Sequence, residues 1–101
     1  MFGKLGDMMG KLQEMKQKAD EIKSRLDDTI LKTDGAGGDI KIEITGNRKI
    51  VNLQISAALQ HGDKQELEEQ LVVAINRAIA EADQVNEQEM KSAASGFLPG
   101  M

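Results

Sequence analysis

The 101-residue chain has no cysteine, no tryptophan and no tyrosine, and it contains only one histidine, one proline and two phenylalanines. The absence of cysteine excludes disulfide bonds, thiol catalysis and cysteine-based zinc sites. Because aromatic side chains are so few, the core must be built from aliphatic residues and methionine. A domain of this length buries only about two-thirds of its unfolded surface. We therefore expect one small domain that completes its core by pairing.

The sequence also lacks the groups on which most catalytic sites depend. The single His61 has no candidate nucleophile or base beside it, and the acidic pair Glu68-Glu69 is typical of a solvated helix. Residues 35–38 are rich in glycine, but no Lys-Ser or Lys-Thr at a helix start follows them, as a phosphate-binding loop requires. We predict that the protein is not an enzyme and needs no cofactor, no metal and no small-molecule substrate.

Long hydrophobic runs are missing as well. No apolar stretch approaches the roughly 20 residues that span a bilayer, and the first residues lack the apolar segment of a signal peptide. The sequence therefore predicts a cytoplasmic protein without a membrane partner.

Charge is plentiful but unevenly distributed along the chain. The net charge is −4, which counts against nucleic-acid binding unless the basic residues are segregated. Residues 1–28 contain six basic and six acidic residues, residues 29–62 four and three, and residues 63–101 three and eight. The last third of the chain thus carries the acidity.

The pattern of apolar residues predicts the order α-β-β-β-α. Residues 1–28 predict a helix, about 39 Å long from Gly3 to Asp28, with a frayed start because glycines lie within its first ten residues. Residues 29–56 predict a three-stranded antiparallel meander with a turn at Gly46-Asn47, whose residue types tolerate positive φ. Asp63 and Glu66 resemble a capping box that starts a helix over residues 63–93, and residues 94–101 predict a tail.

Two of the predicted strands alternate apolar and polar residues, which indicates a sheet with one apolar face. The helices also have one apolar stripe each, so we predict a two-layer α+β domain. Either the helices cover the sheet or the sheets of two chains meet. Because the first helix exceeds the sheet in length and three strands are marginal alone, we favour a homodimer. Its predicted interface comprises the apolar strand residues Ile40, Ile42, Ile44, Val51, Leu53 and Ile55.

Apolar residues in the first helix are spaced alternately three and four apart, as in a coiled-coil seam. This seam comprises Leu5, Met8, Leu12, Met15, Ala19, Ile22 and Leu26. The flanking positions are basic, with Lys4, Lys11, Lys18 and Arg25 on one side and Lys16 and Lys23 on the other. The acidic residues of this helix lie on the side opposite the apolar seam.

The basic flanks have three possible roles. A coiled coil of two copies would place cation against cation, which argues against self-pairing of this helix. The flanks could instead pair with the acidic last helix, and the seam would then pack against that helix. They could also contact a polyanion, since one flank repeats every seven residues, about 10.5 Å along the axis.

Four segments, in their order and spacing, resemble a known family: residues 1–4 (MFGK), 37–44 (GGDIKIEI), 71–78 (LVVAINRA) and 96–100 (GFLPG). Together they are similar to the YbaB/EbfC family of bacterial nucleoid-associated proteins, over nearly the whole chain. The resemblance implies a homodimer shaped like tweezers, with the sheets joined at the centre and the helices projecting as DNA-binding arms.

We therefore predict a nucleoid-associated protein that binds double-stranded DNA non-catalytically as a homodimer, through the phosphate backbone and with little sequence selectivity. The alternative is a dimeric protein-interaction module whose basic flanks bind acidic protein surfaces. The predicted DNA-binding residues are Lys4, Lys11, Lys16, Lys18, Lys23 and Arg25.

Overall fold

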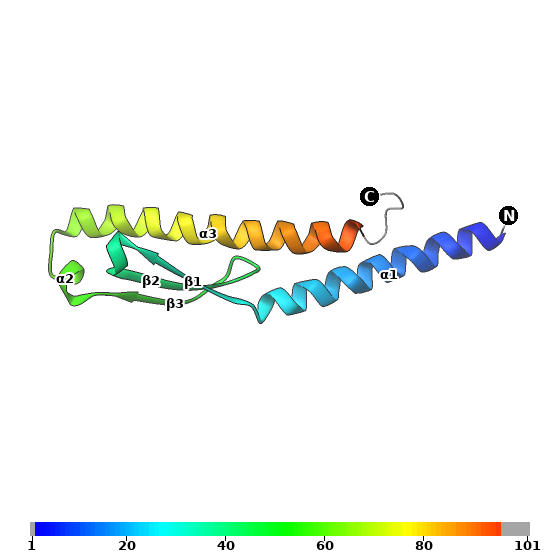
Figure 1. The fold of residues 1–101 in the computed structure, drawn as a ribbon, viewed down its shortest axis with the longest axis horizontal. Coiled ribbons are helices and arrows are strands. Elements are labelled where there is room, and N and C mark those ends of the chain that lie inside the picture. Colours follow the sequence, from blue (N-terminus) through cyan, green and yellow to red (C-terminus); the bar gives the residue numbers. More distant parts are fainter. Residues whose placement is uncertain (1, 96–101) are drawn as a thin grey trace.

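A computed structural model describes the backbone of residues 2–95 and the side chains of residues 6–94. Figure 1 shows helix α1 (Phe2–Asp27), strands β1 (Ile30–Gly35), β2 (Ile40–Thr45) and β3 (Ile50–Ile55), and helix α3 (Lys64–Ser95). The predicted α+β class and its α-β-β-β-α order are confirmed. Two short elements were not predicted: the 3-10 turn η1 (Ala36–Gly38) and helix α2 (Ala57–Gln60).

The three strands form an antiparallel sheet in the order β1-β2-β3, so β2 is central and both other strands are edges. Ile42 of β2 lies opposite Thr33 of β1 and Leu53 of β3. Between β2 and β3 the register shifts after Glu43, which makes Val51 an extra residue on the edge strand. Such a bulge increases the local twist of the strand.

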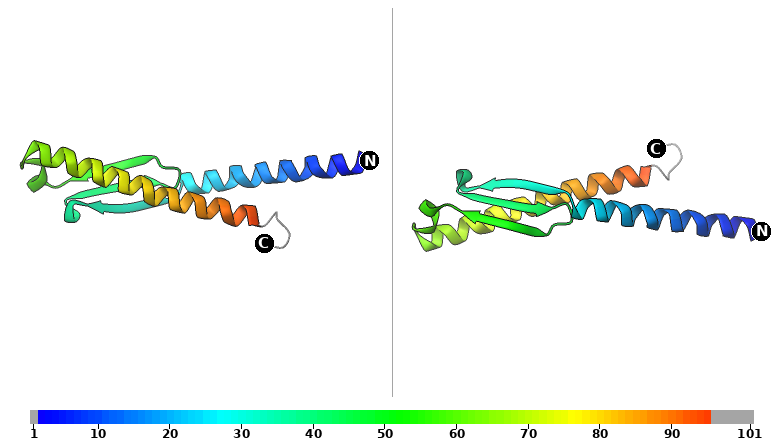
Figure 2. Two further views of the ribbon diagram at one scale, coloured as in Figure 1. Left: turned by 90° about the horizontal axis from the view of Figure 1, so that it is seen from above. Right: turned by 90° about the horizontal axis from the view of Figure 1, so that it is seen from below.

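Helix α3 covers one face of the sheet and forms the core with it (Figures 1 and 2). The three isoleucines of β2 are almost completely buried against three alanines on one face of α3. These core residues are Ile40, Ile42, Ile44, Ala74, Ala78 and Ala82. Because alanine is small, the helix axis can lie close to the strands. Asp63 caps α3 as predicted, since its carboxylate accepts a hydrogen bond from the Glu66 N–H at 3.2 Å.

Helix α1 does not lie on the sheet; it extends beyond it, and the molecule measures 70 × 23 × 17 Å (Figure 1). The helix is continuous through Gly6 and Gly10, so the frayed start was a wrong prediction within the described residues. Packing of the whole seam against the last helix was also wrong. Only Ile22 and Leu26 are buried, near the sheet, whereas Leu12 has 63% of its surface exposed. The helices diverge in space, so α3 contacts only part of the seam (Figure 2).

Two turns differ from the sequence prediction. The residues with positive φ are Ala36 and Arg48, together with Gly37 and Gly38, so Gly46 is not required for turn conformation. Gly46 is required for space, because a Cβ there would lie 2.6 Å from the Leu26 Cδ2 atom and 3.2 Å from the Leu26 carbonyl oxygen. Glycine therefore allows the end of α1 to pack directly on the β2–β3 turn.

Neither of the long helices, over the residues described, has the apolar stretch that crossing a membrane requires. Nor do the described residues gather three or more His, Asp or Glu side chains into a group that could hold a metal ion.

Close packing of α3 on the sheet can be tested at Gly35. A Cβ at this position would lie 2.6 Å from the Ala74 Cβ, so Gly35→Ala should lower the free energy of unfolding by about 1–3 kcal/mol through overpacking. Gly10 is the matched control, because a Cβ there meets nothing within 4 Å. Gly10→Ala should stabilise the helix by about 1 kcal/mol. Urea denaturation measures both; equal effects of the two variants would contradict the close approach.

Candidate nucleic-acid interface

The C-terminal end of α1 is held by the turn between β2 and β3. The Gly46 N–H donates to the carbonyl oxygens of Leu26 and Thr29, both at 3.0 Å. The side-chain amide of Asn47 donates to the Lys23 carbonyl oxygen at 2.8 Å and to the Asp27 carboxylate at 2.6 Å. The last carbonyls of a helix lack partners within the helix. The turn supplies further donors to the carbonyl oxygens of Lys23 and Leu26 in the last two turns of α1 and thereby fixes the direction in which α1 leaves the sheet.

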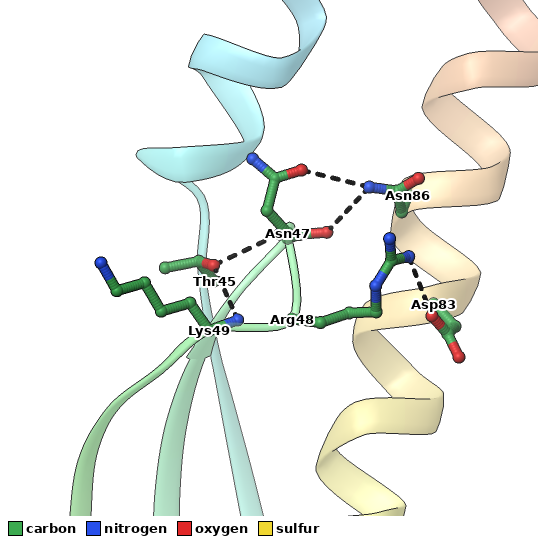
Figure 3. A network of polar contacts seen from close by, with 7 residues as sticks. Thr45, Asn47, Arg48, Lys49, Asp83 and Asn86 are labelled. Carbon is green, nitrogen blue, oxygen red and sulfur yellow. Dashed lines mark hydrogen bonds and ion pairs between the residues drawn. The ribbon is translucent and has the colours of Figure 1, made fainter.

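The same turn is fixed to α3 (Figure 3). The Asn86 side-chain amide donates to the Asn47 side-chain oxygen at 3.2 Å and to the Gly46 carbonyl oxygen at 3.3 Å. Arg48 and Asp83 form an ion pair at 2.9 Å. We call the set of Gly46, Asn47, Arg48, Asp83 and Asn86 the junction. It connects three elements, so it determines where the basic residues of α1 lie.

The basic flanks of α1 lie on a helix that extends away from the rest of the protein. Lys11, Lys16, Lys18 and Lys23 are all exposed, and among the described residues none of the four forms an ion pair. Lys4 belongs to α1, but its side chain lies outside the described residues. Four lysine ammonium groups along one helix are therefore available to a partner.

Arg25 differs from the lysines because it pairs with Glu89 of α3 at 2.9 Å. This is the only ion pair between α1 and α3 among the described side chains. Two other acidic residues of α3, Glu81 and Asp83, pair instead with Arg77 and Arg48. Since both groups of the Arg25 pair are partly exposed, it contributes about 0–1 kcal/mol. Helix α3 thus forms an ion pair with Arg25 and leaves the four described lysines of the flanks without one.

The uncovered face of the sheet is an unsuitable site for a polyanion. Its charged residues alternate in sign across neighbouring strands, with Lys32 opposite Glu43 and Asp34 opposite Lys41. Opposite charges at such positions neutralise each other at short range. Of the described surfaces, α1 is the one that carries several cations on the flanks of one stripe.

The six residues predicted for the dimer interface divide into two groups. Ile40, Ile42 and Ile44 are buried under α3 within one chain and have no surface left for a partner. On β3, Val51 is 50% exposed, Leu53 is exposed and Ile55 is partly exposed. The edge strand β3, rather than the centre of the sheet, therefore offers apolar surface to a second chain.

The junction was missed by the sequence analysis, except for the glycine and asparagine of its turn. A signal for it was available at Asn86, a polar residue that directly follows Val85 on the apolar face of the last helix. A buried or half-buried amide on such a face requires hydrogen-bond partners from another element. The partner itself could not be identified without the fold.

The junction predicts a specific effect of Asn47→Ala. This change removes the donors to the Lys23 carbonyl and the Asp27 carboxylate and the acceptor for Asn86. We expect a loss of about 1–2 kcal/mol in the free energy of unfolding and faster amide hydrogen exchange in the last two turns of α1. Asn76→Ala, at an exposed position on α3, is the control. Unchanged exchange in α1 with Asn47→Ala would show that the junction does not orient the helix.

Comparison with known proteins gives consistent results. A family model described as the YbaB/EbfC DNA-binding family matches residues 1–97. A nucleoid-associated protein of Flavobacterium johnsoniae is 40% identical over 75 residues, covering 73% of this chain and 70% of the relative. One of Hahella chejuensis is 28% identical over 95 residues, covering 94% and 88%. The crystal structure of an uncharacterized Helicobacter pylori protein superposes with a TM-score of 0.74 at 27% identity, covering 96% of both chains.

Proposed function

Because the chain belongs to the YbaB/EbfC DNA-binding family, we propose that it is a nucleoid-associated protein of the cytoplasm that binds double-stranded DNA without catalysis. It acts as a homodimer, contacts the phosphate backbone and has little sequence selectivity. The observation that carries this proposal is the set of four unpaired, exposed lysines on projecting helix α1: Lys11, Lys16, Lys18 and Lys23. Curated relatives named as nucleoid-associated proteins support it.

The lysines suit phosphate contacts better than base recognition. Lysine presents a point charge on a flexible stem, whereas bases are read by side chains that are fixed in place, arginine and asparagine among them. Arg25 is already bonded to Glu89, so we assign it a supporting role. A dimer has a net charge of −8, twice the −4 of one chain, and repels DNA at long range. Binding therefore depends on local contacts that salt weakens.

Reversal of charge on α1 tests this function. Changing Lys11, Lys18 and Lys23 together to Glu should abolish the binding of duplex DNA at about 50 mM salt, since each change replaces a phosphate contact with a repulsion. The matched control reverses three exposed lysines away from α1, Lys32 and Lys41 on the sheet and Lys49 in the connection between β2 and β3, and should retain most of the binding. A gel-shift titration measures both, with circular dichroism as the test of folding.

Salt dependence provides the second half of this test. If all eight lysines of a dimer, four from each chain, contact phosphates, the affinity should fall by about 10⁴ between 50 and 200 mM salt. An affinity that does not change with salt concentration would reject phosphate binding.

Loss of fold or of the dimer in the α1 variant would instead favour the alternative, a protein-interaction module whose basic flanks bind acidic protein surfaces. The Arg25–Glu89 pair favours that alternative at one position.

We further propose that the homodimer forms through the edge strand β3. An edge strand with unpaired backbone groups and exposed apolar side chains offers a template for pairing with another chain. Lysine substitutions distinguish the two edges of the sheet, because Val51 on β3 and Ile30 on β1 are similarly exposed, at 50% and 45%. Val51→Lys should lower the mass in sedimentation equilibrium from twice the 11.0 kDa of one chain to that of a monomer. Ile30→Lys should remain dimeric; the opposite result would place the interface on β1.

A further inference from the structure

The part of the α1 seam that lies beyond the sheet is an exposed apolar stripe in the described structure. Met8, Leu12 and Met15 have 62%, 63% and 44% of their surface exposed. They occupy successive turns of one helix face, so their side chains form a continuous strip. We call these three residues the seam stripe. Apolar side chains gathered in this way usually mark a contact site.

A shallow groove begins where the seam stripe approaches α3. It has a volume of about 140 Å³ and is lined by Met15, Lys18, Ala19, Met90, Ala93 and Ala94. Two of these residues, Ala93 and Ala94, belong to the last described turn of α3. The helices run antiparallel, and α1 continues past Ser95 (Figure 1). The polypeptide that follows Ser95 therefore starts at the groove, and the rest of the seam stripe lies ahead of it.

We propose that the residues after α3, in particular Phe97 and Leu98, dock on the seam stripe of the same chain. The reach is sufficient: Leu12 and Met8 precede Met15 by three and seven residues, about 4.5 and 10.5 Å along the helix. Two residues of extended chain from Ser95, where α3 ends, to Phe97 span up to about 7 Å, and a third residue brings Leu98 to about 10 Å. Gly96 stands where a chain most readily turns away from a helix.

The chemistry of this segment also suits the stripe. Residues 96–101 (GFLPGM) contain three large apolar side chains and no charged one. The stripe is flanked by lysines on both sides, so a second copy of α1 would bring cations against cations. An uncharged apolar segment meets no such repulsion and leaves the ammonium groups in solvent. Docking would tie the end of α3 to α1 and hold the two helices of the arm together. The proposal does not depend on DNA binding.

Engineered cysteines test the proposal, and the chain has no native cysteine to interfere. In the variant Leu12→Cys/Leu98→Cys, docking should bring the two thiols into disulfide range. The control is Glu14→Cys/Leu98→Cys, because position 14 is about 200° around the helix from Leu12 at nearly the same height. Under mild oxidation the first variant should form an intrachain disulfide at least tenfold faster than the control, as measured by non-reducing electrophoresis and mass spectrometry.

Three results would overturn the proposal: equal rates for the two pairs, a disulfide that joins two chains of the double variant, or an interchain product when the single variants Leu12→Cys and Leu98→Cys are mixed. Fluorescence provides a second readout that does not alter Leu98. In Phe97→Trp, the only tryptophan should emit at a shorter wavelength than in the free peptide of residues 94–101 carrying the same change. Adding Leu12→Glu should abolish this shift, and adding Glu14→Gln should not. A shift that survives Leu12→Glu would also contradict docking on the seam stripe.

Discussion

The position of α1 depends on hydrogen bonds between the β2–β3 turn and the last carbonyls of the helix. Without packing against the sheet, α1 has few tertiary contacts that could orient it, since most of its surface is exposed. Gly46 and Asn47 donate to carbonyl oxygens in its last two turns, and Asn86 connects the same turn to α3. The packing of Leu26 on Gly46 leaves no room for a side chain between them. A small set of polar contacts thus aligns a helix of 26 residues.

The choice of alanine on α3 has a related consequence for the sheet. A close approach of α3 to β1 and β2 buries the isoleucines of β2 completely, but a single helix is too narrow to cover three strands equally. The apolar residues of β3 consequently remain accessible at the edge. A core that packs closely on two strands but leaves the third uncovered buries less apolar surface in one chain than it could bury with a partner. This imbalance is the physical reason to expect a partner at β3.

The order of the elements could be predicted from sequence because each element has its own period of apolar residues. The alternation in β2 and the cap of α3 at Asp63 are local signals, and both predictions agree with the structure. The seam of α1 gave an equally clear local signal, yet only Ile22 and Leu26 of its described residues are buried. Periodicity reveals that a helix has an apolar face, but the angle between α1 and α3 depends on the junction, whose residues are distant in sequence. The same limit applies to the basic residues. Their positions on the helix could be predicted from the sequence, but the pairing of Arg25 with Glu89 could not.

The distribution of charge explains how an acidic protein of this family can have a surface for DNA. Acidic residues of the last third of the chain lie on α3, where several are neutralised by neighbours such as Arg48 and Arg77. The lysines of α1 extend away from that region, and at physiological salt a charge is screened beyond about 8 Å. At the far part of α1 a phosphate therefore interacts mainly with the nearby ammonium groups and with the acidic side of the same helix. Each of the four exposed lysines is four residues from an acidic residue, as Lys18 is from Glu14, so the acidic side borders the basic flanks and weakens their attraction for a phosphate. The junction fixes the direction of α1, so under the proposed function its hydrogen bonds position the lysines in addition to stabilising the fold.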